Sequence, residues 1–217
     1  MVLLPLYPHY SSTTVGSSLN EWNRHFRGGM PVHLVQSFYR DERYLDACIE
    51  KIDKALGRFP SSSGSEIVFS AHSLPQSIID KGDPYQKEIE ETVQLLMDRG
   101  GGRTITASAT RVRLEQASGC NHRCTAPCAT CCRESSRRLH RPRVVCFRSR
   151  RDAGEIDHEA REEAAELGLG QFEMTTGLND SPKFIEALAH LVMQAAMRES
   201  FALPTRENVA APLMAAD

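Results

Sequence analysis

Apolar residues recur along the chain in two patterns that alternate with each other. Short continuous apolar runs are typical of strands buried in a parallel sheet, and apolar residues spaced three or four apart are typical of one helix face. The predicted strands lie within residues 1–7, 32–38, 66–71 and 171–175. A first helix is expected to end at Phe26, and the later helical stripes are Leu45, Ile49, Ile52 and Leu56; Ile89, Val93 and Leu96; Ile156, Ala160, Ala164 and Leu167; and Phe184/Ile185, Leu188, Leu191/Val192 and Ala195. This alternation favours an α/β fold, with an open parallel sheet flanked by helices.

Turn and capping residues divide these elements. Gly28-Gly-Met-Pro31 is expected to break the first helix, and residues 60–65 form a polar loop. Asp83, followed by Pro84, is expected to be the N-cap of a helix, and that helix is expected to end at Gly100. Because the first apolar run starts at Met1 and a strand needs neighbours to pair with, we expect that an N-terminal portion is missing.

Composition adds few constraints. The 217 residues are 41% hydrophobic and 25% charged, which excludes collagen-like, coiled-coil and wholly disordered chains. No apolar run approaches the roughly 18 residues needed to span a bilayer, and no secretory signal is visible. We therefore expect a cytoplasmic protein.

The strongest candidate for chemistry is His72 in the segment Phe69-Ser-Ala-His-Ser-Leu-Pro75. It follows an apolar strand at the carboxyl end, where parallel α/β sheets bind ligands. An imidazole there could ligate a metal or accept a proton near neutral pH. A histidine that merely caps the strand end is the alternative, and spacing alone favours it.

Four separated motifs in the right order change that balance. The segment around His72, followed by Gly82-Asp-Pro-Tyr85, resembles the signature of ferrochelatases, the enzymes that insert ferrous iron into protoporphyrin IX. Residues 4–11 and 14–18 together resemble the family's porphyrin-contacting segment. Residues 154–157 and residues 177–188 resemble two motifs near the family's C-terminus. The resemblance covers residues 1–100 and about 154–198.

The resemblance implies a Rossmann-like chelatase fold of two halves, with the porphyrin held between them. It implies that His72 ligates iron or accepts the pyrrole protons, and that Tyr10, Ser17 and Tyr7 contact the porphyrin. Protoporphyrin IX and Fe²⁺ are then the substrates in the last step of heme biosynthesis, with no cofactor required and no nucleic acid as partner. Peripheral membrane association and oligomeric state are left open.

The chain also departs from the family pattern. We expect that the family's first half-domain is missing upstream. We therefore predict a remnant of that half at residues 1–30, the second half at 31–200 with an aberrant insert at 101–153, and a tail at 201–217. The family's metal-side motif, Ser-(Glu/Asp)-His-x-Glu-Thr-Leu, normally runs into Glu-Ile-Asp. Counting back from Glu155, Arg151 occupies the place of its catalytic carboxylate, and a permanent cation cannot ligate iron or accept a proton.

Three acidic residues survive beyond that motif: Glu155, Asp157 and Glu159. They resemble an acidic ladder that leads metal or protons to the site, and a solvated first helical turn explains them equally well. With the carboxylate replaced, we expect little or no chelatase activity from this chain. A porphyrin- or metal-binding remnant without catalysis is the alternative.

Residues 103–151 differ from the rest of the chain in composition. They contain 12 Arg, no Lys, two acidic residues and six of the seven Cys. A GC-rich gene read out of frame gives such a composition, and the return to family sequence at Gly154 suggests a second, compensating shift. A frameshift is therefore the leading hypothesis for residues 101–153.

Two other interpretations of this window are weaker. Cys120, Cys124, Cys128 and Cys131 have ligand types that suit zinc or a [2Fe–2S] cluster, but only Cys128 and Cys131 have a common spacing. A Cys/Arg-rich arm that binds nucleic acid is disfavoured because aromatic residues for stacking are nearly absent. We expect coil through most of 103–143, a strand only at Val144–Phe147, and unpaired edges on the neighbouring strands.

Overall fold

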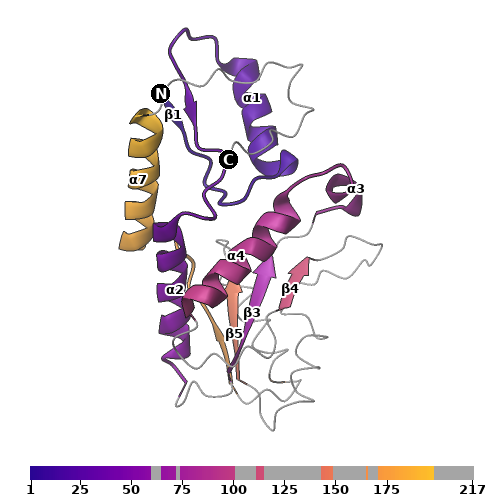
Figure 1. Cartoon of the computed structure of the whole chain (residues 1–217), viewed down its shortest axis with the longest axis vertical. Coiled ribbons are helices and arrows are strands. Elements are labelled where there is room, and N and C mark those ends of the chain that lie inside the picture. Colours follow the sequence, from indigo (N-terminus) through magenta and orange to yellow (C-terminus); the bar gives the residue numbers. More distant parts are fainter. Residues whose placement is uncertain are drawn as a thin grey trace.

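The computed structural model describes residues 1–59, 65–71, 74–100, 111–114, 143–148, 165 and 171–197. Its centre is a parallel sheet with the strand order β4-β3-β5-β6 (Figure 1). The strands are β3 (Ser65–Ala71), β4 (Arg111–Leu114), β5 (Arg143–Arg148) and β6 (Gln171–Met174). All three pairings are parallel, with Phe69 opposite both Val112 and Phe147. The predicted α/β class with a parallel sheet is therefore confirmed.

A second, two-stranded parallel sheet joins the N-terminus to the segment that precedes the first long helix. Its strands are β1 (Val2–Leu3) and β2 (His33–Leu34), with Leu3 opposite Leu34. The expected strands over 1–7 and 32–38 are thus much shorter, and β1 is half-buried rather than buried. Pro5 and Pro8 lack the N–H that a longer ladder needs, and Leu6 between them is 59% exposed.

Helices pack around this framework. They are a π-helical turn, η1 (Ser12–Gly16), followed by α1 (Ser17–His25), α2 (Glu42–Leu56), α3 (Gln76–Ile79), α4 (Tyr85–Gly100) and α7 (Pro182–Met197). Helix α2 contacts α7, whose lower end meets the upper part of α2 in Figure 1, and α2 also contacts α4 and β5. The predicted helix ends at Phe26 and Gly100 agree with these bounds to within one residue.

The hydrophobic core lies where α2, α4 and α7 meet the sheet. It contains Phe38, Tyr44, Leu45, Ala47, Cys48, Ile52, Ala55, Phe59, Ile67, Phe69, Val93, Leu96, Leu178 and Leu191. The predicted stripe of α4 is confirmed, because Ile89, Val93 and Leu96 are all buried. Among the described helices, none combines the length and apolarity that a membrane crossing requires.

The inward face of α7 confirms the predicted stripe and selects between the alternatives left open at two of its positions. Ile185 is 50% exposed and Val192 is 36% exposed, whereas Ala187 is fully buried. The face that packs inward is Phe184, Ala187, Leu188, Leu191 and Ala195. The apolar residues of this helix nearly surround it, so their pattern alone does not choose between Phe184 and Ile185 or between Leu191 and Val192.

The segment rich in Cys and Arg at residues 101–153, here named the Cys/Arg-rich window, contributes two strands to the sheet. Val144–Phe147 lies within β5, as predicted, but β4 at Arg111–Leu114 was expected to be coil. Strand β3 pairs with β4 on one side and β5 on the other, so the expectation that β3 would have an unpaired edge is wrong. The rest of 101–153, the predicted helix at 156–167 and the tail at 201–217 lie outside the described residues, apart from Ala165.

Candidate functional site

A hydroxyl-rich stretch, here named the Tyr10 segment (residues 9–17), is held against the start of α4 by a single carboxylate. Oδ2 of Asp83 accepts hydrogen bonds from the backbone N–H and the hydroxyl of Ser12, both at 2.8 Å, and from the hydroxyl of Ser11 at 3.1 Å. Its Oδ1 accepts from the backbone N–H of Tyr85 at 3.1 Å, so the predicted N-cap is present. Two motifs more than seventy positions apart in the sequence therefore meet at Asp83.

Two further hydrogen bonds fasten the same segment to the first turns of α4. The backbone N–H of Tyr10 donates to Oε2 of Glu88 at 2.7 Å. The hydroxyl of Thr92 donates to the carbonyl of Glu88 at 2.8 Å, which uses its only proton. The 2.8 Å contact between Thr92 Oγ1 and His9 Nε2 therefore has the imidazole as donor. His9 is buried, and its ring stacks on Tyr39 with centroids 5.7 Å apart.

Burial shifts the protonation of these groups. It raises the pKa of Glu88 to about 7, an effect that the nearby negative charge of Asp83 reinforces. Burial lowers the pKa of His9 to about 4, so its imidazole is neutral at neutral pH. The pKa of Tyr10 is raised by burial first, and then by the charges of Asp83 and Glu88. The Tyr10 segment therefore keeps its phenol protonated, and it contacts a carboxyl group of α4, that of Glu88, which titrates near neutrality.

The side chain of Tyr10 folds back over the π-helical turn. A Cβ atom placed on Gly16 would lie 3.2 Å from Tyr10 Oη, so the glycine makes room for the phenol. The next residue, Ser17, is exposed, and its hydroxyl lies 2.9 Å from the carbonyls of both Thr13 and Thr14. The structure thus places Tyr10 next to the turn that carries Ser17, and the Ser17 oxygen keeps acceptor capacity for a ligand.

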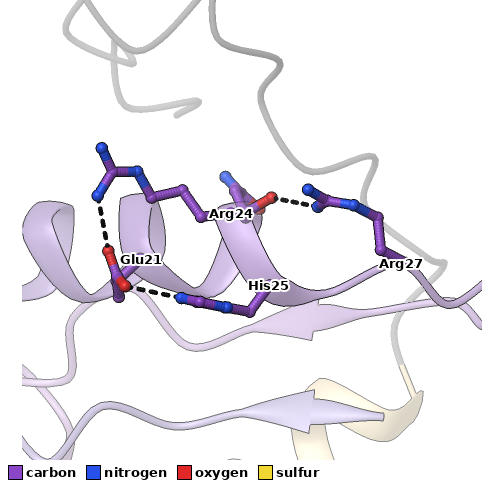
Figure 2. A network of polar contacts seen from close by, with 5 residues as sticks. Glu21, Arg24, His25 and Arg27 are labelled. Carbon is purple, nitrogen blue, oxygen red and sulfur yellow. Dashed lines mark hydrogen bonds and ion pairs between the residues drawn. The ribbon is translucent and has the colours of Figure 1, made fainter.

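Helix α1 continues from this turn and carries a polar network on its outer face. Figure 2 shows Glu21 between Arg24 and His25. Oε2 of Glu21 lies 3.2 Å from a guanidinium nitrogen of Arg24, and its Oε1 lies 2.8 Å from Nε2 of His25. Hydrogen bonds from His25 and Arg24 lower the pKa of Glu21. Arg27 donates to the carbonyl of Asn23 at 3.2 Å. Cations near the end of a helix interact favourably with its dipole, so this network stabilises α1 rather than forming a reactive centre.

Of the remaining predicted site residues, Tyr7 is the one within the described part of the chain. Tyr7 is 36% exposed, next to the more exposed Leu6. His72 directly follows the last residue of β3, Ala71, and is outside the described residues. The other predicted positions outside the described residues are Arg151, Glu155, Asp157, Glu159, Cys120, Cys124, Cys128 and Cys131. Within the described ranges, no group of three His, Cys, Asp or Glu side chains could hold a metal ion.

Sequence reasoning missed the residues that hold the Tyr10 segment in place. Asp83 was interpreted as a helix cap and as part of a family motif, without a link to the Tyr10 segment, and His9, Glu88 and Thr92 were given no role. The available signal was the cluster of hydroxyls at residues 11–14, whose donors need acceptors when buried. A sequence does not reveal that those acceptors come from a helix about seventy residues later.

Comparison with known proteins shows which family the chain belongs to. A model of the ferrochelatase family matches residues 1–111, which contain both the Tyr10 segment and Asp83. The chain belongs to the ferrochelatase family. The resemblance inferred from its motifs is thereby confirmed, and with it the Rossmann-like chelatase fold.

Individual ferrochelatases show the same relationship over a longer stretch. The chain is 39% identical to the ferrochelatase of Geobacter sp. (strain M21), over 90% of this chain and 63% of that protein. It is 33% identical to that of Synechocystis sp., over 90% of this chain and 52% of the relative, and 30% identical to that of Aquifex aeolicus, over 88% and 62%. The chain therefore spans less than two thirds of the length of these relatives.

Proposed function

We propose that this chain binds protoporphyrin IX and acts on it as ferrochelatases do, in the last step of heme biosynthesis. The reaction takes Fe²⁺ and protoporphyrin IX to protoheme and releases the two pyrrole protons. The observation that carries the proposal is the Tyr10 segment, which the Asp83 carboxylate and Glu88 hold on α4 with Tyr10 packed next to the turn that carries Ser17. Family membership supports it, and the cytoplasmic location expected from the sequence is part of the same proposal.

In this proposal the porphyrin lies against the Tyr10 segment. Tyr7 and Leu6 supply exposed apolar surface that a flat aromatic macrocycle can cover. Tyr10 contributes an aromatic edge, and Ser17 a hydroxyl oxygen that accepts a hydrogen bond. These groups bind and orient the ring and take no part in proton transfer themselves.

Proton removal and metal delivery are assigned to other residues. His72, at the carboxyl end of β3, is the proposed base for the pyrrole protons or ligand for the incoming iron. Glu155, Asp157 and Glu159 are the proposed path for metal or protons. Arg151 at the family's carboxylate position leaves His72 without its usual acidic partner, so we expect slow turnover from this chain.

The test is a metal-insertion assay with purified chain, protoporphyrin IX, and Fe²⁺ or Zn²⁺. We expect slow formation of the metalloporphyrin, and no formation in His72→Ala. His190→Ala on α7 is the matched control and should behave like the unmodified chain. If His72→Ala turns over at the unmodified rate, the role assigned to His72 is wrong.

A porphyrin-binding protein without catalysis is the second candidate. The presence of Arg151 where the family has a carboxylate favours it. A shifted porphyrin absorbance band without metalloporphyrin formation, at any metal concentration, would select this candidate over the enzyme.

A further inference from the structure

We propose that Asp83 is a positioning residue, which acts on porphyrin binding through the Tyr10 segment rather than by touching the ligand. This inference rests on the proposed function, because it concerns the surface that would hold the macrocycle. Its basis is the concentration of hydrogen bonds on one carboxylate, three from Ser11 and Ser12 and one from Tyr85.

The two oxygens of Asp83 have separate tasks. Oδ1 caps the start of α4 through Tyr85, as many N-cap residues do. Oδ2 receives every bond that comes from the Tyr10 segment. Among the described residues, the groups that donate to this carboxylate are all uncharged, and they come from both motifs.

Displacement of Ser11 and Ser12 would propagate to the residues proposed to contact porphyrin. The carbonyl of Ser11 accepts from the backbone N–H of Thr14 at 3.2 Å and of Gly16 at 3.0 Å, which sets the π-helical turn. Tyr10 Oη packs against Gly16, and Ser17 follows it. The position of the phenol relative to the Ser17 hydroxyl therefore depends on where Asp83 holds Ser11 and Ser12.

Asp83→Asn separates the two tasks. Asparagine caps helices about as well as aspartate, so the start of α4 should survive. Its amide has one acceptor oxygen and a donor NH₂ group, which cannot accept the three bonds that Oδ2 receives. The variant should therefore fold and loosen only the Tyr10 segment. Asp80→Asn is the matched control, because exposed Asp80 accepts only from the Gln76 side chain at 2.8 Å among the described residues.

Protoporphyrin IX is titrated into the full chain and its variants. Affinity is followed by quenching of Trp22, the single tryptophan, and the bound state by the Soret band at saturation. We expect Asp83→Asn to bind about tenfold more weakly, with a Soret band displaced from that of the unmodified complex, while Asp80→Asn matches the unmodified chain. A variant that is merely less stable would give an unmodified Soret band once saturated.

A second substitution covers the case in which Asp83→Asn does not fold. Ser12→Ala removes one bond to Oδ2 from an exposed position and should weaken porphyrin binding severalfold. In Asp83→Asn it should add nothing further, because the bond is already lost. If Asp83→Asn and Ser12→Ala fold and both show the porphyrin affinity and Soret band of the unmodified chain, the role of Asp83 is wrong and the proposed function stands. Absence of porphyrin binding by the unmodified chain would overturn both.

Discussion

His9 donates a 2.8 Å hydrogen bond from Nε2 to the hydroxyl of Thr92, a residue 83 positions later in the chain. This bond is buried, and it joins the beginning of the Tyr10 segment to the middle of α4. Burial also keeps the imidazole neutral, because the pKa of His9 falls to about 4 from an ordinary value of 6.5. The contact therefore links the geometry of the segment to pH.

The first prediction concerns the stability of this link in acid. Since the folded pKa of His9 is depressed, the unfolded chain binds the proton more readily, and stability falls as pH decreases from 6.5 to 4. The full effect is about 3 kcal/mol. His9→Gln keeps a donor but does not titrate. The measurement is the free energy of unfolding of both proteins in urea, from pH 7 to pH 4. The unmodified chain should lose about 3 kcal/mol relative to His9→Gln over this range. A constant difference between the two free energies would contradict a buried neutral imidazole.

Glu88 should show the opposite pH dependence. Its pKa in the folded chain, about 7, lies above its ordinary value of 4.5, so the unfolded chain releases the proton first and stability falls as pH rises between these values. Glu88→Gln keeps an acceptor for the Tyr10 N–H and removes this loss. Relative to the unmodified chain, the free energy of unfolding of the variant should rise by about 1–2 kcal/mol between pH 4.5 and pH 8. This is less than the pKa shift alone would give, because water screens a half-exposed carboxyl.

Glu90→Gln, on the exposed face of α4, is the control. Equal pH profiles for the unmodified chain and Glu88→Gln would rule out a raised pKa.

Gly16→Ala should weaken porphyrin binding while changing the stability of the chain little. Gly16 has φ −59° and ψ −47°, a helical conformation that alanine adopts readily, so stability should change by less than about 1 kcal/mol. The new Cβ would lie 3.2 Å from Tyr10 Oη and displace the phenol. We expect severalfold weaker protoporphyrin binding, measured by fluorescence quenching. In Tyr10→Phe the same alanine should have no effect on affinity, and a loss of equal size there would show that the hydroxyl contact is irrelevant.

The Cys/Arg-rich window makes a prediction about the gene. If residues 101–153 arise from two compensating frameshifts, another reading frame across codons 100–155 encodes a Gln-Ser-Arg loop and a Ser-x-His-x-Glu-Thr-Leu motif. Nucleotide sequencing of this stretch is the measurement. Absence of both motifs from the alternative frames would refute the hypothesis, and β4 and β5 would then be strands of a genuine Cys/Arg-rich insert.

Local patterns predicted the elements whose signals are strong by themselves. Strand β3 is a continuous apolar run, and α4 has a cap, a proline and a regular stripe, so both were located closely. Strand β4 was missed because Arg111-Val-Arg-Leu114 is short and half charged, and it pairs only because β3 offers an edge. In α7 the stripe was predicted, but the choice between Leu191 and Val192 depends on the elements that pack against the helix, α2 among them.

The candidate site followed the same rule. Motif resemblance pointed to Tyr10 and Ser17, and the structure places the phenol of Tyr10 against Gly16, the residue that precedes Ser17. The resemblance included Asp83 in a motif without a link to the Tyr10 segment and did not point to Glu88 or Thr92, because the importance of these residues comes from hydrogen bonds to a distant segment. Long-range polar contacts depend on the assembled fold, and no local periodicity encodes them.

The central claim is that the Tyr10 segment forms a porphyrin-binding surface. Its most direct test is titration of the purified chain and of Tyr10→Ala with protoporphyrin IX, monitored by Trp22 fluorescence. We predict saturable quenching with one porphyrin per chain, and at least about tenfold weaker binding by the folded variant, because an aromatic contact and its buried area are lost. Quenching that does not saturate, or equal affinities for the two proteins, would contradict the claim.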